Sequence, residues 1–280
     1  GCDDAVVMST RSGFPVLDGV SQFLAGVRAL FAYRDFHLRE VATPKPVDSA
    51  TVDAWQSRLA GGGTLNEASS LTLLSDFGMA TSIAVEANSV ETAIAAAESV
   101  GYPVVLKTAR EGVLHKSDHG GVILGIEEAE QLQHMYEIMS TRLGGDVLVS
   151  PMAPAGIEMI LGVNRDPQFG PVVVVGFGGV LAETINDVQF ALPPFDAAHA
   201  HRCVDRLKLR PLLDGVRGEP AVDVDAFCDL AARFSEMAAA LGDVLMEVDV
   251  NPLIVHAKGA VAVDGLVVGR DRREADRAET

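Results

Sequence analysis

Aromatic residues, basic residues and cysteines are all scarce in this chain. Phe, Trp and Tyr make up 5% of the 280 residues against 48% for all hydrophobic types, so an aliphatic core is expected. Only 22 Lys and Arg residues face 39 Asp and Glu, which gives a formal net charge of −17. Because phosphate backbones need clustered Lys and Arg, and anionic membranes repel such a charge, neither nucleic acid nor a membrane is expected as a partner.

The chain also lacks the cysteine spacing of a metal site or a disulfide framework. Its three cysteines are Cys2, Cys203 and Cys228. They are typical of free thiols in a reducing compartment. The first residues include Asp3 and Asp4 instead of the basic and apolar regions of a signal peptide. The longest apolar stretch, 171–185, is broken by glycines and Glu183 and is too short to span a bilayer. We therefore expect a cytoplasmic protein.

Alternating helix and strand patterns predict an α/β (α+β) protein with two lobes. Five segments are expected: a terminal piece 1–40, a linker 41–63, a first lobe 64–152, a second lobe 153–270 and a charged tail 271–280. In the terminal piece, a strand at 5–8 precedes an amphipathic helix over 16–33. One strand and one helix cannot form a core, so this piece either docks on the rest or ends an upstream domain.

Regular patterns continue through both predicted lobes. Helices are expected over 53–59, 65–77, 89–100, 129–143, 197–207 and 225–241. Strands are expected at 104–106, 147–151, 158–163, 171–176, within 181–192, and at 245–250 and 260–263. The run 176–179 follows a strand but does not match GxGxxG. The chain contains no Walker A, HExxH or GxSxG sequence.

The most informative stretch is 102–122, YPVVLKTAREGVLHKSDHGGV. An apolar strand carries Lys107, and a polar loop follows. The loop consists of His115, Lys116, Ser117 and Asp118 and closes on Gly120 and Gly121. A strand-borne ammonium beside backbone N–H donors can bind along a polyphosphate. The alternative is an ordinary hairpin with a solvated tip.

A second polar pattern lies in LMEVDVNP, residues 245–252. Glu247, Asp249 and Asn251 alternate with other residues, so they share one face of a strand. The next predicted strand leads to Asp264. Carboxylate and amide oxygens on adjacent strands suit Mg²⁺, which keeps waters and phosphate oxygens in its shell. The alternative is a half-exposed edge strand with its polar side chains in water.

With these motifs in place, the chain resembles the ATP-grasp subunit of ADP-forming acyl-CoA synthetases (acetate–CoA ligases), relatives of the succinyl-CoA synthetase β subunit. The resemblance runs from about residue 66 to residue 269. It includes YPVVLK, LHKSDHGGV, VNRDPQFGPVVVVGFGG, LLDGVRG and EVDVNPLIV. Residues 10–38 resemble the last strand and helix of the flavodoxin-like CoA-ligase domain that precedes ATP-grasp in fused members. The implied fold is a two-lobed ATP-grasp domain preceded by the end of that domain.

The resemblance implies a nucleotide site for ATP or ADP. Lys107 would pair with the α- and β-phosphates, and the loop with Lys116, Ser117, Asp118, Gly120 and Gly121 would cover them. Ser150 and Met152 would lie beside the adenine. Glu158 would contact the ribose.

The resemblance also implies a metal site and a phosphoryl carrier. Asn251 and Asp264 would hold Mg²⁺, with Asp249 in support. His115 occupies the position of a second phosphohistidine, which passes a phosphoryl group between the CoA-binding half and ADP. A neutral imidazole suits this role because its pKa lies near 6.5.

The implied function is the nucleotide-binding half of an acid–CoA ligase (ADP-forming). Its partner would be a CoA-binding half, on the same polypeptide or a separate subunit, which brings the carboxylic acid, CoA and phosphate. The first phosphorylated histidine is not visible in this sequence, and Ala191 replaces an arginine common in relatives. The alternative is a non-catalytic ligand-sensing module of the kind fused to protein acetyltransferases. A carboxylate–amine ligase is disfavoured because the HKSD loop is foreign to that class.

Overall fold

The computed structural model describes residues 4–14, 16, 19–38, 47–110, 119–179, 185–216 and 218–271. The chain divides into two units, Gly1–Ala42 and Thr43–Thr280, which are taken separately. The first unit contains α1 (Asp4–Arg11) and α2 (Val20–His37), and neither helix buries a residue. The strand predicted at 5–8 is wrong, because these residues lie in α1. No strand in the described part of this unit offers them a partner, and a helix satisfies its own backbone groups.

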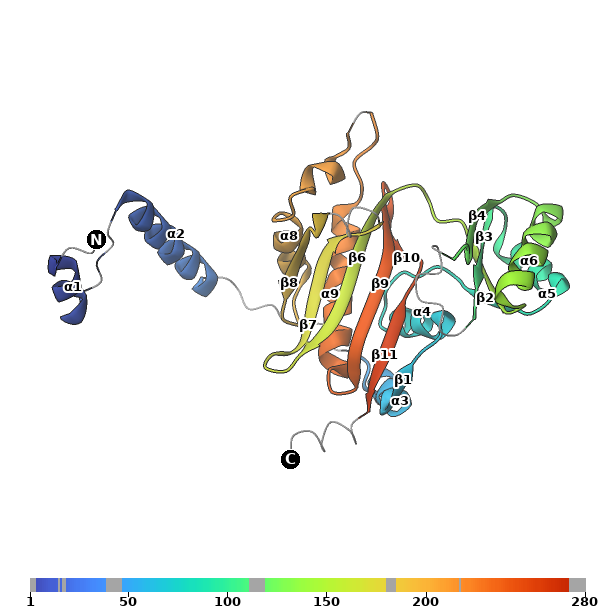
Figure 1. Cartoon of the computed structure of the whole chain (residues 1–280), viewed down its shortest axis with the longest axis horizontal. Helices are drawn as coiled ribbons and strands as arrows, with labels where there is room; N and C mark the ends of the chain where they lie inside the picture. Colours follow the sequence, from blue (N-terminus) through green and yellow to red (C-terminus); the bar gives the residue numbers. More distant parts are fainter. Residues whose placement is uncertain are drawn as a thin grey trace. The chain divides into compact units, whose positions relative to one another are not determined.

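The second unit contains a larger sheet with the strand order β1-β11-β9-β6-β7-β8, in which β10 also pairs with β9 (Figure 1). The strands are β1 (Gly61–Thr64), β6 (Ile157–Asp166), β7 (Gly170–Phe177), β8 (Val188–Ala191), β9 (Leu245–His256), β10 (Gly259–Ala262) and β11 (Leu266–Asp271). All of these pairings are antiparallel. Such a sheet is expected to bury one face and leave the other more polar.

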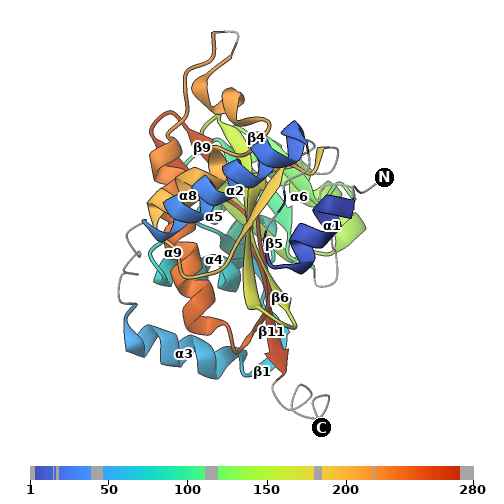
Figure 2. The ribbon, with the colours of Figure 1, turned by 90° about the vertical axis from the view of Figure 1, so that its left-hand side faces the viewer.

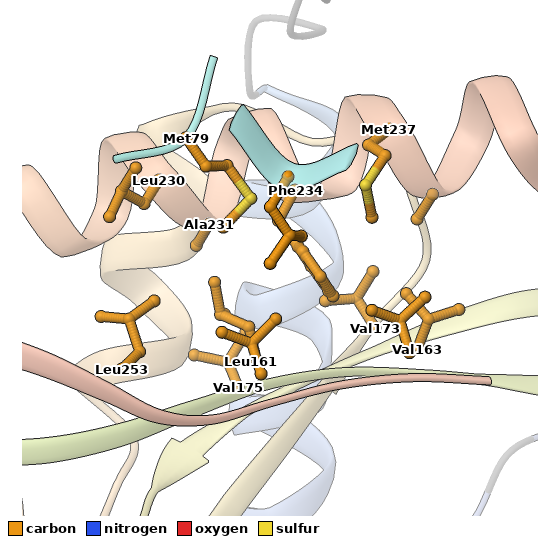
Figure 3. Packing of buried hydrophobic residues seen from close by; sticks show 14 of the residues in the cluster. Met79, Leu161, Val163, Val173, Val175, Leu230, Ala231, Phe234, Met237 and Leu253 are labelled. Carbon is orange, nitrogen blue, oxygen red and sulfur yellow. The ribbon is translucent and has the colours of Figure 1, made fainter. Parts of the chain in front are cut away.

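Helices pack on the buried face of this sheet. They are α3 (Ser49–Leu59), α4 (Glu67–Asp76), α8 (Ala197–Val204), the 3-10 helix η1 (Arg210–Asp214) and α9 (Val224–Leu241). Figure 2 shows α8 and α9 on the same side of β6 and β11. Leu230, Phe234 and Met237 of α9 recur at helical spacing and are buried against the strands. Figure 3 shows Phe234 above Val173 of β7 and neighbouring apolar side chains.

A smaller sheet has the strand order β2-β5-β3-β4. Its strands are β2 (Val85–Ala87), β3 (Val104–Thr108), β4 (Val122–Ile126) and β5 (Val147–Pro151), and its helices are α5 (Val90–Val100) and α6 (Ala129–Leu143). Ser89 and Thr92 form a capping box at the start of α5. Both helices contribute to a second apolar core with β3 and β5. The predicted bounds of α6 and β5 are confirmed.

Three segments differ from the sequence expectation. The run Gly61–Gly63, placed in the linker 41–63, forms most of β1, which pairs with β11. Gly62 has a φ of 72°, and a Cβ there would lie 3.0 Å from the Asp271 nitrogen, so glycine permits this close approach. Strand β11 was not predicted. In the region 181–192, the described strand begins only at Val188.

The helix α4 connects the two sheets in an unexpected way. It falls within the segment 64–152 that we expect to be the first lobe. Its leucines Leu71, Leu73 and Leu74 nevertheless belong to the core of the larger sheet. No helix among the described residues is long and apolar enough to cross a membrane.

Candidate functional site

The side chain of Lys107 is buried at the point where the two sheets meet. Its Nζ donates to the Oε1 of Glu67 at 2.6 Å and to the backbone oxygen of Val263 at 2.7 Å. The Oδ2 of Asp264 lies 3.7 Å away. Lys107 comes from β3 of the smaller sheet, whereas Val263 and Asp264 follow β10 of the larger sheet. A buried cation therefore joins both sheets.

The local sequence explains how Lys107 and Glu67 reach this point. Strand β3 is central in the smaller sheet, where Lys107 pairs with Leu148 of β5 and Val122 of β4. All five of its residues are buried, so a lysine there requires a nearby anion. Glu67 is the first residue of α4, directly after the N-cap Asn66. The helix start fixes its backbone, and the helix dipole favours a carboxylate at this position.

Asn66 provides a second link between α4 and the smaller sheet. Its side-chain oxygen accepts from the Ser69 nitrogen at 2.9 Å and so caps the helix. Its Nδ2 donates to the Oε1 of Glu86 on β2 at 3.1 Å. The first turn of α4 thus contacts two strands of the smaller sheet, while the rest of the helix packs in the larger core.

The strand register sets the expected positions of the predicted metal ligands. Ala262 pairs with Leu253 and Leu266 pairs with Asp249, and Asp264 lies between these two pairings, so we expect it to lie near Asn251. Directly opposed residues on antiparallel strands have Cβ atoms about 4.5–5.5 Å apart. Asp249 lies two residues before Asn251, on the same face of β9. A metal site formed by these three residues stays a prediction from the sequence.

The donor atoms in this neighbourhood fit a hard cation. Asp249 and Asp264 supply carboxylate oxygens and Asn251 an amide oxygen, which are the ligands that Mg²⁺ prefers. The Oδ1 of Asp264 accepts from the Gly265 nitrogen at 2.8 Å, which orients the carboxylate. No group of three His, Cys, Asp or Glu side chains in the described part of the chain is arranged for a metal. A bound Mg²⁺ usually keeps waters and phosphate oxygens in its shell, so the three residues need not supply every ligand.

Two other predicted contacts lie on β5 and just after it, beside the lysine strand. Ser150 pairs with Val105 and is buried, and its Oγ has no hydrogen-bond partner among the described residues. Met152 is 40% exposed, and its nitrogen donates to the oxygen of Pro103 at 2.9 Å. The buried hydroxyl of Tyr102 also lacks such a partner, and burial, with the charge of Glu98 second, raises its pKa. Unsatisfied hydroxyls of this kind are uncommon in protein interiors.

Glu158 is the second residue of β6, where its side chain is exposed, and it contacts the glycine run 176–179. Its backbone oxygen accepts from the Gly178 nitrogen at 2.8 Å. Gly179 has a φ of 62°, and a Cβ there would collide with the Glu158 carboxylate. The glycines therefore permit a close approach to Glu158. From the sequence, this run could approach an anion but lacks a dinucleotide fingerprint, and its contact with Glu158 was not predicted.

The loop that follows β3 is described only in part. The residues His115, Lys116, Ser117 and Asp118 lie outside the described residues. Gly120 is exposed and Gly121 is buried at the end of the loop, and the oxygen of Gly121 accepts from the Thr108 nitrogen at 2.8 Å. The described end of the loop therefore lies next to the residue that follows Lys107.

Sequence analysis missed Glu67 and the backbone oxygen of Val263. A glutamate after an Asn N-cap has an ordinary local explanation in helix capping. It precedes Lys107 by 40 positions, so no spacing pattern connects the two. The signal available in the sequence was indirect: a lysine in an otherwise apolar strand requires a buried carboxylate somewhere in the chain.

Three comparisons identify similar proteins. A family model for the ATP-grasp domain matches residues 56–268. Acetate–CoA ligase (ADP-forming) I of Archaeoglobus fulgidus is 39% identical over 222 residues, covering 76% of this chain and 32% of the ligase. The beta subunit of acetate–CoA ligase (ADP-forming) II of Pyrococcus furiosus is 35% identical over 193 residues, covering 65% of this chain and 81% of the subunit.

A solved structure of an acetyl-coenzyme A synthetase is also similar to this chain. It is the dinucleotide forming acetyl-coenzyme A synthetase 1 of Ca. Korarchaeum cryptofilum in complex with coenzyme A and Mg-AMPPCP, at a TM-score of 0.68 and 33% identity. The match covers 79% of this chain and 100% of that one. The chain spans about a third of the length of the Archaeoglobus ligase and about four fifths of the Pyrococcus subunit. From the family match and the coverage of the beta subunit, the chain belongs to the ATP-grasp domain family and is related to the beta subunits of ADP-forming acetate–CoA ligases.

Proposed function

We propose that the chain is the nucleotide-binding half of an acid–CoA ligase (ADP-forming). ATP or ADP would bind with Mg²⁺ between Lys107 and the pair Asn251 and Asp264. The observation that supports this most directly is the approach of Lys107 Nζ to Asp264 Oδ2 at 3.7 Å, from two different sheets. A polyphosphate with its metal needs both a fixed ammonium and oxygen ligands within a few ångströms of each other.

The comparisons support this proposal in two respects. The structure of the Korarchaeum synthetase is described as a complex with a magnesium nucleotide and coenzyme A, with a phosphohistidine segment pointing towards the nucleotide binding site. The relatives include both a long single chain and a beta subunit. We infer that this chain works with a CoA-binding half, on the same polypeptide or on a separate one, which binds the carboxylic acid, CoA and phosphate. The named relatives are ligases, which favours this function over a ligand-sensing module.

The predicted site residues would bind different parts of the nucleotide or the metal ion. The Lys107 ammonium would bind phosphate oxygens, with the glycines 120 and 121 closing the loop beside it. Ser150 and Met152 would lie along the adenine, and Glu158 would bind the ribose. Asn251, Asp264 and Asp249 would hold Mg²⁺, which when bound neutralises phosphate charge during phosphoryl transfer.

Phosphoryl transfer requires a nucleophile, and we assign this role to His115 from the sequence. A neutral imidazole nitrogen would attack the γ-phosphorus of ATP, so that an N–P bond forms while the P–O bond to the β-phosphate breaks and ADP leaves. In the reverse direction, a terminal phosphate oxygen of ADP would displace the imidazole and form ATP. His115 lies outside the described residues, so this assignment rests on the resemblance of the HKSD loop.

We also place the protein in the cytoplasm. Cys203 and Cys228 are both free and buried, on α8 and α9. Unpaired cysteines are the usual state in a reducing compartment.

Calorimetry with ADP and Mg²⁺ tests the proposal. Replacing Asp264 by Asn removes one charge and keeps the shape, so Mg–ADP binding should weaken more than ADP binding without metal. The matched control is Asp214→Asn, in an exposed pair with Arg210, which should leave both affinities unchanged. Failure of the wild-type chain to bind Mg–ADP, or an equal loss with and without metal in Asp264→Asn, would contradict the proposed site.

A further inference from the structure

The buried carboxylate of Glu67 has no part in the functions assigned so far. Its side chain is 3% exposed and that of Lys107 is 8% exposed, so both ions are removed from water. The 2.6 Å distance from Nζ to Oε1 is short for a charge-assisted hydrogen bond. A pair this buried is costly to form, and stability alone is a weak reason to have it.

Because an ammonium group is tetrahedral, the contact of Lys107 with Glu67 helps to determine where its other N–H donors point. Nζ is tetrahedral, with one bond to carbon and three N–H donors. Two donors are directed by the Glu67 carboxylate and the Val263 oxygen, at 2.6 and 2.7 Å. Once two directions are fixed, the third is fixed as well. The Asp264 oxygen at 3.7 Å is beyond hydrogen-bond distance, so it attracts the ammonium without taking a donor in the described structure.

We infer that Glu67 is a positioning residue: it fixes the direction of the remaining Lys107 N–H donor, so that a nucleotide phosphate meets an ammonium that is already oriented. The inference rests on the proposed nucleotide site. The position of Glu67 supports it, because α4 packs in the larger core and Lys107 belongs to the smaller sheet. Glu67 therefore holds the ammonium relative to the larger sheet, which carries Asn251 and Asp264.

Simple electrostatics makes the opposite prediction, and this makes the inference testable. Glu67 carries a negative charge and should repel phosphates, so its removal would strengthen nucleotide binding if charge alone mattered. If Glu67 orients Lys107, its removal weakens binding, because a free lysine side chain loses rotamer entropy when it is immobilised.

The experiment compares two neutral variants that differ in one respect. Glu67→Gln keeps an acceptor oxygen for Nζ, whereas Glu67→Met has similar length and suits a helix but has no such acceptor. Affinities for Mg–ADP and for adenosine are measured by calorimetry for both, with Glu137→Ala as a control at an exposed glutamate on α6. Glu67→Met should lose about tenfold or more in Mg–ADP affinity and less than about twofold in adenosine affinity. Glu67→Gln should recover at least about fivefold of the loss.

Several outcomes would contradict the positioning role of Glu67. Equal Mg–ADP affinities for the Gln and Met variants, tighter binding by both, or parallel losses for adenosine and Mg–ADP would overturn the positioning role. In a Lys107→Met background, Glu67→Gln should change Mg–ADP affinity by less than about twofold, and this measurement replaces the first if Glu67→Met does not fold. A wild-type chain that binds no Mg–ADP would overturn the proposed function and this inference together. A wild-type chain that binds, with Glu67→Met binding equally well, would overturn this inference alone.

Discussion

Replacing Lys107 by Met should destabilise the protein, mainly because the buried carboxylate of Glu67 remains without a counter-ion. Met keeps the apolar stem and removes the ammonium, which leaves the Glu67 carboxylate, 3% exposed, without its cation. Removing one partner of a buried pair costs about 3–5 kcal/mol. The Val263 oxygen also loses its donor from Lys107, which adds about 1 kcal/mol. Asp264 is 29% exposed and remains partly hydrated, so it should add little.

The double variant Lys107→Met/Glu67→Gln tests this reasoning. Glu67→Gln alone should cost about 1.5–3 kcal/mol, because an acceptor oxygen remains for Lys107. With both charges removed, no uncompensated ion is left in the interior. The double variant should therefore be more stable than Lys107→Met alone, and the coupling between the two sites should be about 1–3 kcal/mol.

Urea unfolding followed by fluorescence and circular dichroism measures these free energies. Trp55 is the single tryptophan of the chain and is buried in the larger core, so its emission reports the loss of that core. The exposed pair Arg210 and Asp214 is the control, and its coupling should stay below about 1 kcal/mol. Additive costs for Lys107→Met and Glu67→Gln would refute the argument, because they would mean that the two charges do not depend on each other.

Three further predictions concern other parts of the chain. Asp187 is buried and accepts from the nitrogens of Lys208 and Leu209 at 2.9 and 2.8 Å. Asp187→Ala should therefore cost about 2–4 kcal/mol in urea unfolding, whereas Asp205→Ala, at an exposed carboxylate, should cost less than about 1 kcal/mol. Burial, with Asp225 second, raises the pKa of Cys228 from 9.0 to about 12. Because the unfolded thiol ionises first, the free energy of unfolding should fall as pH rises from about 9 towards about 12, and an equal decline in Cys228→Ala would disprove this. Finally, acid-labile phosphate should appear on the chain when the CoA-binding half, acyl-CoA and phosphate are supplied, and should be absent in His115→Ala; labelling that persists in this variant would exclude the relay.

Much of the fold could be predicted because the signals are local. Helix α6 lies between an extended residue and Gly144, and β5 is a short apolar run with clear limits. The run Gly61–Gly63 was misleading because glycine usually marks a turn, whereas here it permits β1 to approach β11. Residues 5–8 were assigned to a strand by β propensity, which depends strongly on a neighbouring strand.

In the candidate site, too, some residues follow from local sequence patterns and others depend on tertiary packing. The sequence predicts that Asn251 and Asp264 come from neighbouring strands, and β10 does pair with β9. The partner of Lys107 could not be predicted, because Glu67 enters from a helix whose contacts with the smaller sheet are set by tertiary packing. Local patterns identify which residues lie on one strand, but not which distant helix supplies the compensating charge.

The pairing of β1 with β11 has a consequence for biosynthesis. Gly61 lies opposite Asp271, so the larger sheet cannot close until about 210 further residues have been translated. The smaller sheet has its own core between Ala87 and Val149, a continuous segment that can fold first. During that interval the apolar faces of α3 and α4 have no sheet to cover them. During synthesis the chain therefore exposes the apolar faces of α3 and α4, which are prone to aggregation until β11 is available.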